Sequence, residues 1–291
     1  MGNIIWELDF YSRPIVDENK KKLWEVVICE SPNQIDRSLD SLFQYSQYCS
    51  NQTVNSIWLK EAIEKAIQEA EEAPKKIRFF RRQMNNMITK ACDDIGIAAI
   101  PSRRTYALNQ LLDKRMQEVY PNEPGYDSKA AKSASVKYPA INAIPLPDAV
   151  KGDKGDKWAF VTLEASAFSE MNEWDISFGE AFPLSLANIN PDTKIPGLII
   201  YSPRATPLAA WMSGLEMGWL DLDTGSFPRL ILETGVSDNW ILVNLTSPQT
   251  TEEAKNFNQA KDQANGVHFL AVQSSVESDA FAGFWLLKEE N

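Results

Sequence analysis

Basic and aromatic side chains are concentrated in residues 75–82, where the sequence reads KKIRFFRR. The wider segment 75–115 carries ten basic and three acidic side chains, although the whole chain has a net charge of −11. Guanidinium groups match phosphates, and aromatic rings stack on unpaired bases with about 1–3 kcal/mol each. The pattern therefore predicts a confined surface for single-stranded RNA. Its candidate residues are Lys75, Lys76, Arg78, Phe79, Phe80, Arg81, Arg82, Arg103, Arg104 and Tyr106, with Lys114 and Arg115 extending the basic charge.

The same residues also have a structural interpretation. Taken alone, Phe79 and Phe80 favour a hydrophobic core, whereas the arginines are either helix-flanking surface charge or anion ligands. We expect anion binding by the arginines, because a local net charge of +7 stands out in an acidic chain. Arg204 precedes an expected helix whose first N–H groups attract anions, and it fits a local ion pair in a loop equally well.

Carboxylates suggest a rival chemistry. Glu7 and Asp9 are two residues apart on an expected strand, so both side chains point to one face. Glu25 and Glu30 lie on the expected partner strand. Such a group suits Mg²⁺ and phosphodiester cleavage by a two-metal route. The alternative is ordinary surface charge on a hairpin, with Glu7 paired to a lysine of residues 20–22.

Other catalytic chemistry finds little support. The chain has one histidine, His268, which we expect to be packed inside a strand. The run KGDKGDK resembles a phosphate-binding loop only superficially. The three cysteines form no CxxC pair, and Cys29 lies in an apolar run that predicts a buried thiol. We expect no cofactor.

The elements that position these residues alternate in type. Strands, helices and turn formers predict the order ββαβαβα in the first part of the chain, with an irregular loop at 33–52, either with or without a short helix. That order implies an α/β layer and is the one found in ribonuclease-H-like folds. Asn55 or Ser56 is expected to cap the first helix. The expected elements are 4–13, 21–31, 53–73, 76–81, 83–96, 97–102 and 103–121.

Residues 121–156 are rich in Pro, Gly, Ala, Ser and Lys, which predicts a linker between a domain at 1–120 and a second at 157–291. The second domain is expected to be a mixed α/β sheet. Residues 170–182 suit either a helix or a loop, and the closing stretch GFWLL suits a buried strand. The other expected strands are 157–165, 195–202, 218–224, 229–235, 239–245 and 267–275, with helices at 207–217 and 250–266, the latter capped by Thr250 or Thr251.

The N-terminal residues show no secretory or transit signal, and no stretch approaches about 18 uninterrupted apolar residues. We therefore expect a cytoplasmic protein without a membrane span. The overall acidity argues against a protein that coats nucleic acid with its whole surface.

Several stretches together resemble one family, the Tab/Atab proteins of cyanobacteria, algae and plants. The resemblance runs nearly end to end, excluding the loop at 31–55 and the linker, and includes the terminal triplet WLL. The matching stretches are WELDFYSRPI, KKLWEVVICES, KIRFFRRQMNNMITKAC, IPSRR, KWAFVTL, IPGLIIYSPRATPLAAWMSGLE, GVHFLAVQ and GFWLL.

The resemblance implies a non-enzymatic RNA-binding factor for photosystem biogenesis, which binds the A/U-rich 5′ untranslated region of mRNA. Translation or photosystem assembly factors are the implied protein partners. Plant and algal members work in the chloroplast stroma, whereas this chain is similar to the cyanobacterial, cytoplasmic form. The two rival functions are a Mg²⁺-dependent nuclease using Glu7, Asp9 and Glu25, and an assembly scaffold that does not contact RNA.

Overall fold

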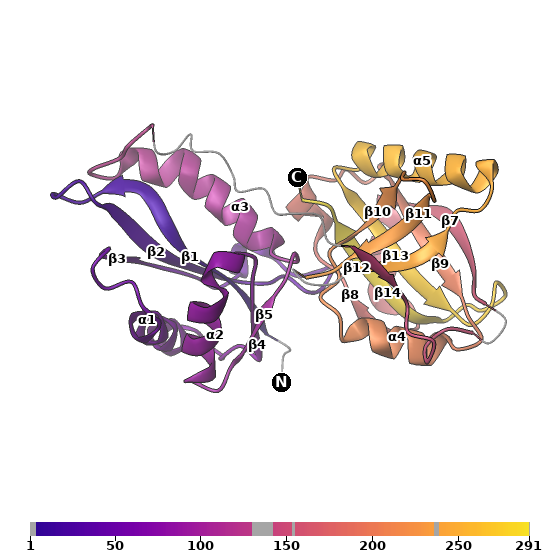
Figure 1. The fold of residues 1–291 in the computed structure, drawn as a ribbon, viewed down its shortest axis with the longest axis horizontal. Coiled ribbons are helices and arrows are strands. Elements are labelled where there is room, and N and C mark those ends of the chain that lie inside the picture. The colour runs from indigo at the N-terminus through magenta and orange to yellow at the C-terminus, as the bar shows by residue number, and fades with distance from the viewer. Residues whose placement is uncertain (1–3, 130–141, 153–154, 236–238, 291) are drawn as a thin grey trace. The chain divides into compact units, whose positions relative to one another are not determined.

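The computed structural model describes residues 4–129, 142–152, 155–235 and 239–290 (Figure 1). The chain forms two compact units, the first from 1–31 and 40–140 and the second from 32–39 and 141–291. Each unit mixes strands with helices, so the expected α/β class is confirmed. Within the described residues no helix is both long and apolar enough to cross a membrane.

The first unit contains a five-stranded sheet with the strand order β3-β2-β1-β4-β5. The first three strands pair antiparallel, whereas β1, β4 and β5 run parallel. This is a ribonuclease-H-like arrangement, with one strand more than the sequence predicted. The strands are β1 (Ile5–Val16), β2 (Lys22–Glu30), β3 (Gln44–Cys49), β4 (Lys76–Phe79) and β5 (Ala98–Pro101).

The additional strand β3 corrects the expectation of a loop over 33–52. Its sequence QYSQYC is largely polar, so it lacks the apolar alternation that marks most strands. It forms because β2 offers a free edge and because Cys49 and Tyr45 pack against the core at that edge. Tertiary pairing therefore outweighs local composition here.

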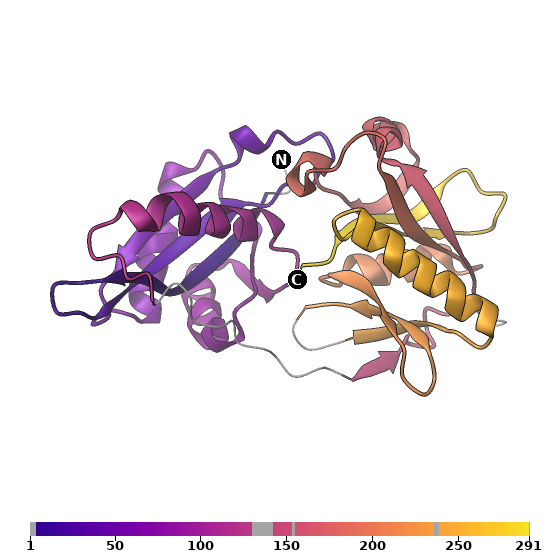
Figure 2. The same ribbon diagram turned by 90° about the horizontal axis from the view of Figure 1, so that it is seen from above.

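Helices cover both faces of this sheet. Helix α1 (Ser56–Glu69) and helix α2 (Asn85–Asp93) pack on the apolar face, which includes Trp6, Leu8 and Phe10 of β1. Helix α3 (Tyr106–Lys114) lies across the other face (Figure 2). Successive side chains of a strand alternate between faces, so Glu7 and Asp9 point towards α3 and are buried. The expected solvent face of the hairpin is thus an interior face.

The helix boundaries follow local capping signals. Asn55 caps α1 as expected, and its side chain accepts the N–H of Trp58 at 2.9 Å. In the second unit the prediction of a Thr cap is wrong, because Ser247 caps helix α5 (Pro248–Gln263) through a capping box with Thr250. Helix α4 (Ala205–Ser213) begins two residues before the expected 207.

The second unit packs two sheets together, with the strand orders β10-β11-β12-β6 and β7-β9-β13-β14-β8. Apolar side chains of both sheets, of α4 and of α5 share one core. The terminal Trp285–Leu287 triplet lies buried in β14, as expected for GFWLL. The strands are β6 (Ala143–Pro145), β7 (Lys157–Glu164), β8 (Ile176–Glu180), β9 (Lys194–Tyr201), β10 (Trp219–Asp223), β11 (Arg229–Glu233), β12 (Asn239–Asn244), β13 (Val267–Gln273) and β14 (Phe281–Lys288).

Two expectations for this part of the chain are corrected. Residues 165–173 form 3-10 turns and are followed by β8, where the sequence suggested one helix or a loop. Strand β6 lies inside the expected linker and pairs with β12, so part of the linker has regular structure. Residues 130–141 and 153–154 of that linker lie outside the described residues. The division into domains 1–120 and 157–291 stays a prediction.

His268 is fully buried in β13, as expected. Its Nε2 accepts the N–H of Leu220 at 2.8 Å, and its Nδ1 lies 2.8 Å from the carbonyl oxygen of Gly266. Only a neutral imidazole with its proton on Nδ1 satisfies both contacts. The histidine therefore has a structural role, joining β13 to β10.

Candidate nucleic-acid interface

Two parallel strands bring the basic segments after them to one edge of the first sheet. Phe79 of β4 pairs with Pro101 of β5, where both strands end. The chain then continues from that edge through 80–82 and through 102–103. Four side chains of these segments are partly exposed, and we call them the carboxyl-edge set: Phe80, Arg81, Arg82 and Arg103.

Other expected RNA-binding residues are inside the unit. Arg78 is only 1% exposed, and its Nη1 donates to Oγ of Ser31 at 3.5 Å. Phe79 is also 1% exposed and belongs to the apolar core, which agrees with its structural interpretation. Arg104 and Tyr106 are buried where α3 packs on the sheet. None of these four reaches RNA without a rearrangement, so their assignment to the surface is corrected.

The remaining candidates lie elsewhere. Lys75 and Lys76 are at the amino end of β4, because Lys76 pairs with Ile5 at the start of the parallel β1. Arg204 belongs to the second unit and precedes the first residue of α4, with its side chain making no capping hydrogen bond. Within the first unit, the residues predicted as one RNA site therefore do not form one surface, and Arg204 belongs to the other unit.

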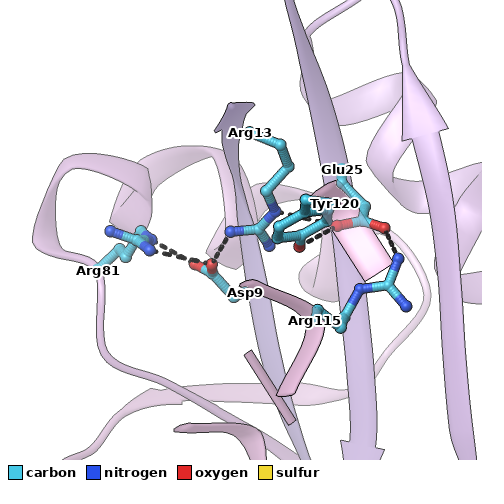
Figure 3. Close-up of polar contacts among 6 residues, drawn as sticks. All are labelled: Asp9, Arg13, Glu25, Arg81, Arg115 and Tyr120. Carbon is cyan, nitrogen blue, oxygen red and sulfur yellow. Dashed lines mark hydrogen bonds and ion pairs between the residues drawn. The ribbon is translucent and has the colours of Figure 1, made fainter. Parts of the chain in front are cut away.

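Much of the local positive charge is used inside the unit, in a network drawn in Figure 3. Asp9 accepts hydrogen bonds from Nε and Nη2 of Arg81, the latter at 3.1 Å, and from Nη1 of Arg13 at 2.9 Å. The Nε of Arg13 donates a hydrogen bond to Glu25 at 3.0 Å. Glu25 also accepts hydrogen bonds from Arg115 and, at 2.6 Å, from the hydroxyl of Tyr120. We call these six residues the arginine–carboxylate cluster: Asp9, Arg13, Glu25, Arg81, Arg115 and Tyr120.

A change of helix type lets Arg115 and Tyr120 reach the same carboxylate. After α3 the chain makes a π-helical turn over Arg115–Val119, in which the N–H of Tyr120 bonds the carbonyl of Arg115. The wider turn brings residues five apart onto one side of the helix, which an α-helix would separate. Both side chains therefore point at Glu25 on β2.

Neighbouring charges shift the pKa values of Arg13 and Tyr120 in the cluster. Burial lowers the pKa of Arg13, but the charge of Asp9, with Tyr120 and Glu25, outweighs that effect and raises the pKa. Burial, aided by the charge of Glu25, raises the pKa of Tyr120 despite the opposing charge of Arg13. The guanidinium group of Arg13 thus stays charged, and Tyr120 stays a protonated donor.

The carboxylates do not form the metal site considered from the sequence. Glu7 accepts the N–H of Leu108 at 2.7 Å, which satisfies an otherwise orphan donor in the first turn of α3. Asp9 and Glu25 each accept from arginines instead. No group of three or more His, Cys, Asp or Glu residues suited to a metal occurs in the part of the chain that the structure describes. These contacts give Glu7, Asp9 and Glu25 partners other than a metal ion, and the strand register places Glu7 opposite Cys29, at the other end of the hairpin from residues 20–22.

The comparisons with known proteins agree with the resemblance seen in the sequence. Residues 5–115 match the family described as RNA-binding protein Tab2/Atab2 N terminal, and residues 133–288 match its C-terminal domain. The chain belongs to the Tab2/Atab2 family of RNA-binding proteins.

Two curated members of the family show how far the similarity extends. The "Protein TAB2 homolog, chloroplastic" of Arabidopsis thaliana is 41% identical over 289 residues, which are 97% of this chain and 74% of that protein. The protein of the same name from Zea mays is 38% identical over 290 residues, covering 97% and 70%. The similarity therefore includes both units of the chain.

Solved structures give a much weaker likeness. The integrase catalytic core domain of HTLV-2 matches with a TM-score of 0.27 and 14% identity over 44% of this chain and 79% of that one. A simian T-cell lymphotropic virus intasome matches with a TM-score of 0.30 and 13% identity, covering 56% and 64%. Neither match bears on what this family member does.

Sequence reasoning did not find the cluster as a unit. It singled out Asp9 and Glu25 as metal ligands and did not consider Arg13 or Tyr120. A usable signal was present, since Asp9 and Arg13 share one face of the same strand and carry opposite charges. Nothing in the local sequence indicated that the π-helical turn would deliver Tyr120 to the same place.

Proposed function

We propose that this family member binds A/U-rich single-stranded RNA of 5′ untranslated regions and so assists translation and biogenesis of photosystem subunits in a cyanobacterial cytoplasm, without catalysing a reaction. The observation that carries the proposal is the family match over both units, since that family is described as RNA-binding. The relatives from two plants are named as chloroplastic, which fits a role connected with photosynthesis.

The carboxyl-edge set is the part of the first unit that best suits RNA. It combines three arginines with the ring of Phe80 at one edge of the sheet, all partly exposed. Arginines contact phosphates, and a partly exposed ring stacks on an unpaired base. A confined site of this size also agrees with a chain whose net charge is −11.

A nuclease is the less favoured function. The carboxylates that would assist cleavage are occupied by guanidinium groups and by a helix N–H. Releasing them for a metal would leave buried arginines without counter-charges, which costs several kcal/mol. The proposal of a non-catalytic protein depends on this geometry.

A gel-shift experiment with labelled A/U-rich RNA, run in Mg²⁺ and separately in EDTA, tests the proposal. We expect an intact, shifted band in both buffers, with an affinity that falls as salt rises. Cleavage in Mg²⁺ alone would instead support the nuclease. The absence of a shift even at low salt would support a scaffold that does not contact RNA.

A pair of charge-removing variants tests the location of the site. The double variant Arg82→Gln with Arg103→Gln is expected to weaken binding to all RNA sequences. The salt slope, which is the slope of the logarithm of the binding constant against the logarithm of salt concentration, should fall in magnitude by about 0.7 for each lost phosphate contact. The matched control is Lys75→Gln with Lys76→Gln, which removes the same charge at the other end of β4. Equal losses in the two double variants would mean that net charge, and not the carboxyl edge, determines affinity.

A further inference from the structure

Arg81 belongs both to the carboxyl-edge set and to the buried cluster. Its guanidinium group has two edges that can each donate two hydrogen bonds. Asp9 accepts from the edge that carries Nε and Nη2. The other edge, with Nη1 and the second hydrogen of Nη2, donates to no acceptor among the described residues, and the side chain is 24% exposed.

The position of this group is set from three sides. The ring centroid of Tyr11 lies 4.1 Å from the guanidinium carbon, and that of Phe80 lies 4.8 Å from it. Asp9 itself is fully buried and is held by Arg13. Figure 3 shows Arg81 at one end of the network, with Asp9 between it and Arg13. Arg81 therefore has far less rotational freedom than an ordinary surface arginine.

The charge of Arg81 is only partly compensated. Asp9 is shared between Arg81 and Arg13, and the cluster holds three guanidinium groups against two carboxylates. A second anion at the outer edge of Arg81 would complete the balance. A planar guanidinium edge accommodates two oxygens of a phosphate in a bidentate contact.

We propose that the outer edge of Arg81 binds one phosphate of single-stranded RNA, and that Asp9 is the residue that positions it. This inference rests on the proposed RNA-binding function and deepens it. Preorganisation is the physical reason, because a fixed guanidinium group loses little conformational entropy when it binds.

Asp9→Asn separates positioning from simple electrostatics, since the two effects have opposite signs. The variant removes a negative charge beside the phosphate site, so electrostatics alone predicts tighter binding. If Asp9 positions Arg81, its loss weakens binding although the site becomes more positive. We expect about threefold to tenfold weaker binding, the size of an ordering cost for one long side chain.

The affinities of the full-length variants for an A/U-rich RNA oligonucleotide are measured over a range of salt concentrations. Arg81→Gln is expected to bind about tenfold more weakly, with the magnitude of the salt slope reduced by about 0.7. Arg81→Lys keeps the charge but loses the bidentate edge, so it should keep most of the slope while still losing affinity. Glu7→Gln is the matched control, because it removes another buried carboxylate of β1, one that accepts from the N–H of Leu108 and not from Arg81, so its affinity for RNA should not fall.

The outcomes distinguish this inference from the function on which it rests. Failure of the unaltered protein to bind RNA would overturn both. Binding by the unaltered protein with unchanged affinity in Arg81→Gln would overturn the inference alone. Tighter binding by a folded Asp9→Asn would show that Asp9 masks Arg81 and does not position it. If Asp9→Asn does not fold, the two Arg81 variants still decide whether that edge contacts phosphate.

Discussion

The arginine–carboxylate cluster makes a quantitative prediction about stability, in which charge balance decides the order of effects. Glu25→Gln keeps the size of the side chain but leaves Arg13 and Arg115 with one fewer buried negative charge. Arg13→Met removes a cation instead. Asp9 then keeps Arg81, and Glu25 keeps Arg115 and Tyr120.

The expected magnitudes follow from burial. Breaking a buried ion pair by removing one partner costs about 3–5 kcal/mol, because the remaining charge is uncompensated. Glu25→Gln should approach that range. Arg13→Met should cost much less, about 1–2 kcal/mol, because it leaves two guanidinium groups beside two carboxylates and also removes Nη2, a buried donor without an acceptor.

Cysteine labelling gives an assay that reports on the first unit alone. All three cysteines, Cys29, Cys49 and Cys92, lie in that unit and are buried. Brief alkylation across a urea series, read by mass spectrometry, therefore follows unfolding of this unit in the full-length chain. With a urea dependence of about 2 kcal/mol per molar, Glu25→Gln should lower the midpoint by roughly 2 M.

Charge balance requires Arg13→Met to be the milder change, so an equal or larger midpoint shift for Arg13→Met would refute it. A shift below about 0.5 M for Glu25→Gln would show that water reaches the cluster and screens it. Adding Arg115→Met to Glu25→Gln should recover part of the loss, because it removes one of the uncompensated cations.

Three further predictions concern single groups. Glu7→Leu should lower the stability of the first unit by about 1–3 kcal/mol, because the N–H of Leu108 loses its acceptor. The same cysteine labelling measures this loss, and Glu7→Gln should cost less because it keeps an oxygen at that position. Burial raises the pKa of Cys92 from 9.0 to about 12, so the stability it contributes is complete below pH 9 and declines as pH rises towards 12. At pH 10 the loss is about 1.4 kcal/mol relative to pH 8, seen in urea midpoints by circular dichroism, and Cys92→Ala should reduce that difference. His268→Phe should destabilise the second unit by about 1–3 kcal/mol in thermal melts, because the N–H of Leu220 is left buried and unpaired, and an unchanged melting temperature would contradict that role.

Much of the architecture could be predicted from the sequence, since the local signals agreed with one another. The expected elements 4–13, 21–31 and 53–73 correspond to β1, β2 and α1, and Asn55 caps α1 as expected. Strand β3 was missed because its stability comes from an edge of β2 and not from its own composition. The start of α5 was misplaced because Thr250 or Thr251 was taken as the cap, whereas Ser247 caps the helix through a reciprocal capping box with Thr250.

The candidate site was predictable only in part. The concentration of positive charge in 75–115 is real, and it led to the carboxyl-edge set. Local sequence does not distinguish an arginine that faces solvent from one that is covered by another element. Arg78 and Arg81 are three residues apart, yet the first is 1% exposed and the second has a side chain that is 24% exposed.

The amino-acid sequence by itself determined the α/β class, the family and the segment in which positive charge gathers. These depend on composition and short-range periodicity, which are properties of the chain read in order. Only the tertiary structure decided which charges are available to a ligand. Covering the second face of the sheet with α3 turned Glu7, Asp9 and Glu25 from candidate metal ligands into acceptors for a helix N–H and for arginines. An unpaired buried charge is energetically costly, so these carboxylates form ion pairs and hydrogen bonds with residues from distant segments. Sequence spacing does not reveal such long-range contacts.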